Sequence, residues 1–580
     1  MTLRRGTLVD PSAAIAVAGV GLLVVQWAAA RPLWLDEELL AINLRDRGIL
    51  TYFEPLWLGQ SVPFGWLAIE RLVVIAFGAG ERALRCLPVL FGIGTLAAAV
   101  WIGRRWMTAA GRTALVILCA GSQWLTFYFL ELKSYSADAF FALLLPAIAA
   151  WSVESAGLKP CATTTQGDST PVAQAFRLTA VAQAFRLTAV AQAFRPATFW
   201  IVAAIAQWFA NGALFVTPLC ALMIAAMLAR RNEWRSAALP FLLSAAVWIG
   251  SLALNYFFVL RHAQSSAYLQ SFWAFAFPPP PAGAAGTLQW LGTQLAAFGV
   301  KPGSTRFGVL LWIAAAAGFA AGAMRRRSAS LFFATVPPAA MLLAVLRLVP
   351  LYERLTLWMV PALYVGVAFL ADAAWSVFVS GRSEDRPATP LAALGLGVAI
   401  LICGDVVVLG VPAAVLRAGA RHENRGHDDR AAVRWLMSHE QPGDVWMTTH
   451  YGVPAIWWYA GVEGRRIIEV TDEPEPAACR HDNLTAAVAD APRVLLYLGF
   501  RYDDAPRGFD DRLVGRLSQL GSVTSFRPFA DDGNALVIDR RVAPGAPTTL
   551  SRLHQRPTDA PAAIDGCFAV RVADIPTFVR

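Results

Sequence analysis

Long apolar segments, several of them ending in arginines, dominate this chain of 580 residues and leave few folds open to it. A bilayer core of roughly 30 Å needs about 20 mostly apolar residues per helix. Hydrophobic residues make up 57% of the sequence and charged residues only 15%, which excludes an ordinary soluble enzyme. We therefore predict an α-helical polytopic membrane protein with about eleven spans. The predicted spans are 12–30, 84–103, 113–129, 137–153, 198–210, 212–229, 236–257, 307–323, 329–349, 355–375 and 389–411.

Arginine clusters between the spans predict the topology, because positively charged loops stay in the cytoplasm. The clusters that fall on one side are Arg4-Arg5, Arg104-Arg105, Arg230-Arg231, Arg325–Arg327 and the segment 382–386. They also account for the net charge of +9, so no nucleic-acid partner is inferred. The N-terminus is then cytoplasmic, and segment 12–30 is interpreted as a retained anchor. If 198–210 and 212–229 formed one kinked helix, every later loop would change sides.

The opposite, extracytoplasmic side receives the loop 31–83, the loop 258–306, the turns near 130–136 and 350–354, and the tail. Stretch 62–79 is apolar, but Glu70 and Arg71 at its middle would be costly at the bilayer centre. We expect an interfacial helix there instead of a span.

Two further regions interrupt or follow the spans. A nine-residue unit beginning Val-Ala-Gln-Ala-Phe-Arg repeats through 172–198, inside a predicted cytoplasmic insert at 154–197. The period is too short for a solenoid, so we interpret the repeat as an inserted linker without a catalytic role.

After residue 411 the chain becomes polar, and 412–580 is predicted to form an extracytoplasmic α/β domain. Cys479 and Cys567 fall there and could pair.

Short strands and helices alternate in the tail. Apolar runs bounded by turn residues predict strands at 445–450, 494–500 and 535–539. Helices are predicted at 428–439 and 452–460. An aromatic-rich stretch between Trp446 and Tyr459 could face a sugar, but ordinary core packing is the favoured interpretation.

Three consecutive acids, Asp36, Glu37 and Glu38, follow the first predicted span. Adjacent carboxylates at a membrane edge repel one another and lose hydration, so acids kept there suggest chemistry on a lipid-borne substrate. The alternative is structural, because acids in the first turn of a helix favour its macrodipole.

Other short motifs follow the triplet in a fixed order. They are Glu54-Pro55-Leu56, Gly59-Gln60-Ser61-Val62-Pro63, Gly80-Glu81-Arg82-Ala83-Leu84-Arg85, Glu131-Leu132-Lys133-Ser134-Tyr135, Tyr352-Glu353-Arg354 and Pro361. In this order and topology they resemble the GT-C membrane glycosyltransferases, over roughly residues 1–375. Within that superfamily the chain is most similar to the protein mannosyltransferase and aminoarabinose transferase type, including related bacterial proteins of unassigned acceptor.

The resemblance implies transfer of a sugar from a polyprenyl-phosphate donor to a lipid, glycan or protein acceptor at the outer face of a bacterial inner membrane. Asp36 matches the position of the base, with Glu37 beside it. The phosphate leaving group needs cations, for which Lys133 and Arg354 are the candidates. A single inverting displacement needs one carboxylate and no covalent intermediate.

Further residues are assigned supporting roles by the same resemblance. Glu131, Tyr135 and Gln60 are candidates for positioning the substrate, and Glu131 could alternatively orient Lys133 or bind a metal. No cofactor is implied with certainty, and a divalent metal stays open. Besides the donor and acceptor, membrane lipids are the only expected partners.

Structural interpretations remain for several of these residues. Lys133 could be a snorkelling interface residue, and Arg354 could simply anchor a helix end. Glu81 and Arg85 are four residues apart and are interpreted as a helix-stabilising pair.

The alternative for the whole chain is a transporter or polysaccharide export component. Transporters place charges at mid-membrane and often show internal repeats, whereas the charges here stand at outer span ends.

Overall fold

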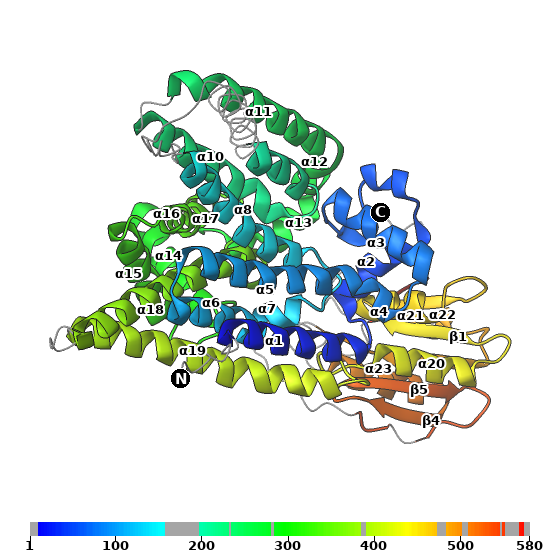
Figure 1. Cartoon of the computed structure of the whole chain (residues 1–580). Coiled ribbons are helices and arrows are strands. Elements are labelled where there is room, and N and C mark those ends of the chain that lie inside the picture. Colours follow the sequence, from blue (N-terminus) through cyan, green and yellow to red (C-terminus); the bar gives the residue numbers. More distant parts are fainter. Residues whose placement is uncertain are drawn as a thin grey trace, which may run out of the picture. The chain divides into compact units, whose positions relative to one another are not determined.

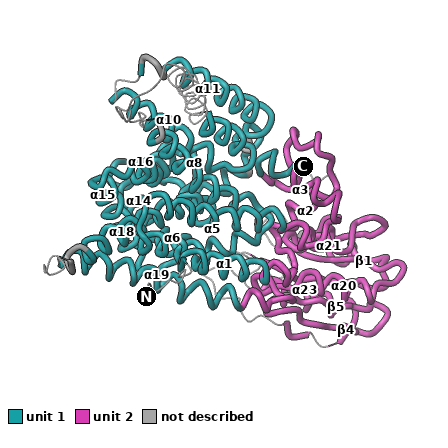
Figure 2. Tube along the Cα trace, in the orientation of Figure 1, with its two compact units in different colours: residues 1–25, 62–68, 86–415 teal, residues 26–61, 69–85, 416–580 magenta. Residues whose placement is uncertain are grey.

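The computed structural model describes residues 10–156, 197–230, 234–279, 283–383, 390–471, 483–501, 508–545, 548–550 and 568–572. Its chain divides into two compact units, shown in two colours in Figure 2. Unit 1 contains residues 1–25, 62–68 and 86–415, and unit 2 contains residues 26–61, 69–85 and 416–580. The first outer loop is thus grouped mainly with the tail. The predicted boundary at residue 412 stays a prediction.

Unit 1 is built from helices (Figure 1). Its longer helices include α1 (Pro11–Ala28), α5 (Cys86–Trp106), α6 (Ala109–Gly121), α8 (Tyr135–Ala156), α10 (Asn211–Arg230), α11 (Trp234–Asn255), α14 (Gly283–Val300), α15 (Gly308–Met324), α17 (Val336–Val345), α18 (Val360–Ser383) and α19 (Pro390–Gly419). Shorter ones include α7 (Gln123–Tyr128), η3 (Tyr256–Leu260), α12 (Arg261–Ser265), α13 (Ala267–Phe272), η4 (Ala274–Ala276), α16 (Ser328–Ala334) and η5 (Glu353–Met359).

Within the described ranges, eight helices are long and apolar enough to cross a membrane. They are Pro11–Ala28, Glu81–Trp106, Tyr135–Glu154, Asn211–Arg230, Ala238–Leu260, Ser328–Val345, Glu353–Val379 and Pro390–Gly419. Shorter apolar helices at Ala109–Gly121, Ala197–Ala206 and Gly308–Met324 occupy the other predicted ranges. The prediction of an α-helical integral membrane protein is confirmed, whereas the exact number of about eleven spans stays a prediction.

Small residues allow the helices of unit 1 to approach closely, as is common between membrane helices. Helix α18 packs against α15 and α6, and α8 packs against α5 and α10. At the contact of α15 with α18, a Cβ added to Gly318 would lie only 1.8 Å from the carbonyl oxygen of Gly366. No side chain fits there without separating the two helices. The backbone contact therefore fixes their crossing.

The loop between the first two spans folds into short helices. These are α2 (Leu35–Asp46), η1 (Ile49–Phe53), η2 (Trp57–Gly59), α3 (Phe64–Phe77) and α4 (Glu81–Leu84). Helix α3 has 14 residues, too few to cross a bilayer of ordinary thickness. Its length agrees with the expectation that 62–79 does not span.

The tail forms the predicted α/β domain, in which one mixed sheet has the strand order β4-β5-β3-β1-β2-β6. Its strands are β1 (Val445–Thr449), β2 (Ile467–Thr471), β3 (Arg493–Leu498), β4 (Ser522–Phe529), β5 (Gly533–Asp539) and β6 (Ala569–Val572). Strand β1 pairs in parallel with β2 and β3, while β4, β5 and β6 pair antiparallel with their neighbours. Helices α20 (Asp429–His439), η6 (His450–Gly452), α21 (Val453–Tyr459), α22 (Leu484–Ala487) and α23 (Phe509–Ser518) connect them.

The two faces of this sheet form two hydrophobic clusters. Every residue of β1 and β3 is buried, as expected for central parallel strands. Val445, Met447 and Leu496 pack on one face, and Trp446 and Leu495 pack on the other. Of the aromatic residues in this stretch, Trp446 belongs to the core and Tyr459 packs against it.

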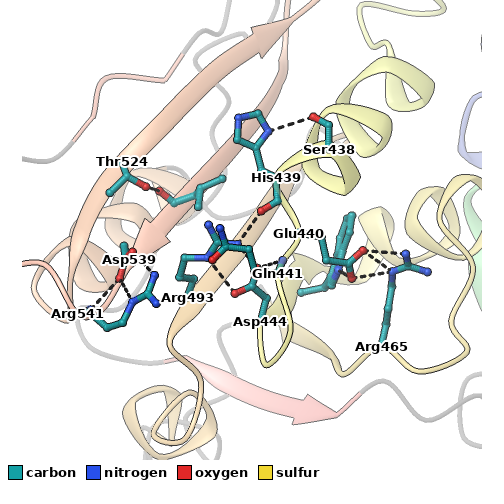
Figure 3. A network of polar contacts seen from close by, with 12 residues as sticks. Ser438, His439, Glu440, Gln441, Asp444, Arg465, Arg493, Thr524, Asp539 and Arg541 are labelled. Atoms are coloured by element: carbon teal, nitrogen blue, oxygen red, sulfur yellow. Dashed lines mark hydrogen bonds and ion pairs between the residues drawn. The ribbon is translucent and has the colours of Figure 1, made fainter.

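Ion pairs hold the amino ends of the central strands (Figure 3). Arg493, the first residue of β3, binds Asp444 immediately before β1, with its Nε atom 3.0 Å from Asp444 Oδ1. Arg493 also donates to the carbonyl oxygen of His439 at 2.6 Å. Glu440 accepts from Arg465 at 2.8 Å and from the Trp446 indole at 2.7 Å. These contacts hold together the amino ends of β1 and β3.

The repeat at 172–198 lies almost wholly outside the described residues, as do Cys479 and Cys567. The interpretation of the repeat as a linker and the suggested cysteine pair therefore stay predictions.

Candidate functional site

The acidic triplet occupies the first turn of α2, which begins at Leu35 with Trp34 as its N-cap. Consecutive residues of a helix project about 100° apart. Asp36, Glu37 and Glu38 therefore face three different environments, although they are adjacent in sequence. Asp36 is partly exposed, whereas the other two side chains are fully buried.

Glu37 is held by an ion pair and by backbone contacts within unit 2. The Arg85 Nε atom lies 2.8 Å from Glu37 Oε1, and the side chains of both residues are buried. Arg85 also donates to the carbonyl oxygens of Arg31 at 2.6 Å and Pro32 at 3.1 Å. Glu37 in turn accepts from the Trp34 backbone amide at 3.4 Å, as in a capping box. Glu37 therefore links the loop to the first turn of α2.

Glu38 meets a second carboxyl group. Both of its oxygens are buried, and no N–H or O–H donor of the described residues reaches them. Burial raises the pKa of Glu38 well above its ordinary value, and contact with the carboxyl of Asp429 raises it further. Burial also raises the pKa of Asp429, which accepts a hydrogen bond from the Tyr497 hydroxyl. Two negative charges in contact at this buried position would repel each other strongly.

Of the three acids, Asp36 alone is partly exposed, whereas Glu37 and Glu38 are fully buried. A general base must be reachable by the group whose proton it takes. Glu37 and Glu38 do not meet this condition, since their carboxyls are committed to Arg85 and Asp429. The assignments of Asp36 as the base and of Glu37 as a positioning residue stay predictions.

The predicted ion pair between Glu81 and Arg85 is replaced by two longer-range pairs. Arg85 binds Glu37, and Glu81 binds Arg430 of the tail at 3.0 Å. Helix α4 contains only Glu81–Leu84, and Arg85 is its C-cap with non-helical dihedral angles. The spacing of four residues therefore does not place the two side chains on one helix face.

In unit 1, Glu131, Lys133 and Tyr135 lie together in the turn between α7 and α8. The Lys133 amide donates to the Glu131 carbonyl at 2.7 Å, and the Tyr135 ring lies 5.0 Å from that of Tyr128. The Glu131 side chain is buried, while Lys133 and Tyr135 are partly exposed. This turn presents one cation at the entrance to a predicted span.

Arg354 belongs to η5, which packs against α8. Its guanidinium lies 5.7 Å from the centre of the Trp273 ring, and Tyr352 packs against the same ring at 5.8 Å. Gly212, at the start of α10, contacts both of these elements. Its amide donates to Asp138 of α8, and a Cβ added to it would collide with Trp358 of η5. Arg354 thus lies in an element that packs against α8, and Lys133 lies two residues before α8 begins.

Gln60 lies in unit 2, is partly exposed, and donates through its amide group to the Leu58 carbonyl at 3.1 Å. A positioning role for Gln60 stays a prediction.

Unit 1 contains two hollows close to its helices. An apolar groove of about 590 Å³ lies between α6, α18 and α19, with Thr113, Trp375 and Cys403 among its lining residues. A smaller pocket of about 280 Å³ lies between the end of α14 and the start of η5. Lys301 and Glu353, 3.9 Å apart, line this pocket next to Tyr352. Sequence reasoning did not select Lys301, because an isolated lysine in a loop carries no motif.

Over the described part of the chain, no group of three or more His, Cys, Asp or Glu side chains is arranged to hold a metal ion. Glu131 is the candidate that the sequence suggested. A single carboxylate is far from a complete oxygen site for a divalent cation.

No protein-family profile matches the sequence, and no curated protein matches it either. Solved structures are similar over most of the chain. ArnT from Cupriavidus metallidurans in its apo state is 14% identical, with a TM-score of 0.44 over 92% of this chain and 99% of that one. A second structure of ArnT, bound to undecaprenyl phosphate, is likewise 14% identical with a TM-score of 0.43.

An oligosaccharyltransferase shows a comparable similarity. AglB from Archaeoglobus fulgidus, in complex with an inhibitory peptide and a dolichol-phosphate, is 12% identical, with a TM-score of 0.43 over 84% of this chain and 69% of that one. These alignments to ArnT and AglB cover most of this chain at 12–14% sequence identity.

Proposed function

We propose that this protein transfers a sugar from a polyprenyl-phosphate donor to an acceptor hydroxyl at the outer face of a bacterial inner membrane. The observation that carries the proposal is the separation of roles within the acidic triplet. Two of its acids are buried against partners, and Asp36 alone is partly exposed. A membrane enzyme that activates a hydroxyl requires one accessible carboxylate of this kind.

In the proposed reaction the oxygen of the acceptor hydroxyl forms a bond to the anomeric carbon of the sugar. The bond from that carbon to the phosphate oxygen breaks, and its electron pair leaves with the polyprenyl phosphate. Asp36 takes the proton of the acceptor hydroxyl. The displacement inverts the anomeric carbon in one step, so no covalent sugar–enzyme intermediate forms.

The leaving phosphate gains negative charge as the bond breaks, and cations that meet it lower the barrier. Lys133 and Arg354 are the cations proposed for this task. Both are partly exposed at ends of predicted spans. Lys133 lies two residues before α8, which packs against η5, the element that contains Arg354. The apolar groove between α6, α18 and α19 shows that unit 1 has hydrocarbon-lined space at its surface, as an enzyme with a prenyl substrate requires.

The activity can be tested without knowing the sugar in advance. Purified protein is incubated with membranes from a strain that lacks the gene and with a panel of radiolabelled undecaprenyl-phosphate sugars. We expect one donor to lose its label to a membrane acceptor. A parallel comparison of lipids and glycans between the parent strain and the deletion strain identifies that acceptor. Unchanged lipids and glycans together with no turnover of any donor would contradict the proposal.

Lys133→Ala is expected to weaken donor binding more than acceptor binding. A hydrogen bond to a charged group contributes about 1.5–3 kcal/mol, which corresponds to roughly a 10- to 150-fold rise in the apparent KM for the donor. Lys133→Arg keeps the positive charge and serves as the matched control. An unchanged donor KM in Lys133→Ala would exclude Lys133 from the phosphate site.

A further inference from the structure

The carboxyl ends of β1 and β3 form the crevice at which open α/β sheets usually bind ligands. The two strands are parallel neighbours, and their connections leave in opposite directions. Strand β1 continues through α21 to β2 on one side, and β3 continues through α23 to β4 and β5 on the other. This change of direction is the topological switch point of a doubly wound sheet.

Aromatic side chains occupy this crevice, and one of them comes from the first outer loop. Phe500, two residues after β3, packs against Tyr451 after β1, with ring centres 6.4 Å apart. The same ring packs against His427 at 5.9 Å and against Trp34 at 6.1 Å. Trp34 is the N-cap of α2 and is 95% buried, with the guanidinium of Arg425 3.7 Å from its ring centre. The place of a ligand is therefore taken by the segment that leads into the acidic triplet.

The backbone of this segment is bound by side chains of the tail. Arg430 donates to the Ala30 carbonyl at 3.0 Å, and Asn424 donates to the Pro32 carbonyl at 2.9 Å. The Leu33 amide donates to the Tyr459 hydroxyl at 2.9 Å. All these residues belong to unit 2. Three successive bonds from α20, α21 and the loop before them fix the path of the chain just before α2.

The contact between Glu38 and Asp429 joins the same two parts of the chain. Glu38 lies in α2 and Asp429 begins α20, and both side chains are buried. Asp429 is held in place by the hydroxyl of Tyr497 in β3. A carboxylic acid that donates its proton to a carboxylate forms a short, strong hydrogen bond, and the pair lacks this bond once the proton leaves.

We propose that the switch-point crevice of the tail domain is the docking site of the chain's own first outer loop, and that a proton shared by Glu38 and Asp429 latches the loop there. Glu38 and Asp429 are thereby positioning residues for Asp36, two residues earlier in the same helical turn. This last step rests on the proposed function, whereas the latch itself does not.

Several titratable groups face the pair and set its response to pH. They are Glu37 on α2, His427 and Asp428 before α20, Tyr459 on α21 and Tyr497 on β3. Burial raises the pKa of both tyrosines, so they stay neutral through the physiological range. The pKa of Glu38 is raised in the docked state. Docking is therefore strongest below the ordinary pKa of this carboxyl, 4.5, and weakens as the pH rises through the raised value.

Hydrogen exchange of the full-length protein in lipid nanodiscs tests the latch without any substrate. Protection of peptides from 31–46 is measured between pH 5 and 9 and corrected for intrinsic exchange. In the wild type, protection is expected to fall by up to tenfold per pH unit once the pair loses its proton. In Glu38→Gln the amide donates to Asp429 at every pH, so protection is expected to stay constant. Glu54→Gln, at an exposed side chain of the same loop, is the matched control and should behave as the wild type.

Peptides from β3 serve as an internal control, because a globally unfolded variant would lose protection there as well. Asp429→Asn provides a second variant that should also remove the pH dependence. The latch is contradicted if the wild type and Glu38→Gln show the same pH dependence of protection in 31–46. It is also contradicted if protection of this segment in the wild type does not change with pH. A transfer assay over the same pH range then separates the two proposals. If activity survives at high pH only in Glu38→Gln, the result supports the positioning role of the pair. If the latch is intact but the protein has no transferase activity, the result contradicts the proposed function and leaves the latch standing.

Discussion

Asp36→Asn is expected to reduce sugar transfer by about 10²- to 10⁴-fold, the usual contribution of a general base. Asparagine has nearly the same shape as aspartate but cannot take the proton of the attacking hydroxyl. The measurement is the initial rate of label transfer from a polyprenyl-phosphate sugar to the membrane acceptor by purified protein.

The fold should be unaffected by this substitution, because Asp36 is partly exposed and lies outside the buried pairs of Glu37 and Glu38. Expression and the temperature of thermal unfolding in detergent are expected to match the wild type. Glu54→Gln again serves as the control and should retain full activity. Transfer by Asp36→Asn at a rate near that of the wild type would refute the assignment of the base.

Arg85→Met is expected to destabilise the protein by about 3–5 kcal/mol, because it leaves the buried Glu37 carboxylate without its cation. It also removes the hydrogen bonds that Arg85 donates to the carbonyl oxygens of Arg31 and Pro32. The effect is measured as a lower unfolding temperature and a lower yield of folded protein in detergent.

Glu37→Gln with Arg85→Met forms the matched double variant. With no buried charge left unpaired, it is expected to recover part of the stability that Arg85→Met loses. Arg82→Met is a suitable single control, since Arg82 is a neighbouring arginine with an exposed hydrogen bond to the Ala28 carbonyl. Equal stability of Arg85→Met and Arg82→Met would show that the buried pair is unimportant.

Local patterns in the sequence predicted the elements of the protein well. The apolar segments predicted the positions of most long helices, and the alternation of the tail predicted β1, α20, α21, β3 and β5. The 18-residue helix α14 was missed, because it lies in the stretch 258–306 that was predicted to be a loop. Strands β2, β4 and β6 were missed. Strand β4 is half-exposed at the edge of the sheet, and it lacks the apolar run that marks a buried strand.

The partners of the acidic triplet could not be predicted from local patterns. Arg85 lies 48 residues from Glu37, and Asn424 lies 387 residues from it. Spacing of four residues suggested that Arg85 pairs with Glu81, but the helix there is too short to place the two on one face. The sequence likewise offered a catalytic and a capping role for the triplet as alternatives. In the structure these adjacent positions of α2 have different surroundings, since Glu37 and Glu38 are buried and Asp36 is partly exposed.

The central claim places the Asp36 side chain in extracytoplasmic water within reach of a prenyl carrier. Labelling of Asp36→Cys by a membrane-impermeant maleimide in intact cells tests it most directly, with the wild type run in parallel to account for the seven native cysteines. We predict rapid labelling from outside, and slower labelling in outward-facing proteoliposomes when undecaprenyl phosphate is added. Labelling only after the cytoplasm is opened, or a rate that undecaprenyl phosphate does not change, would contradict the account.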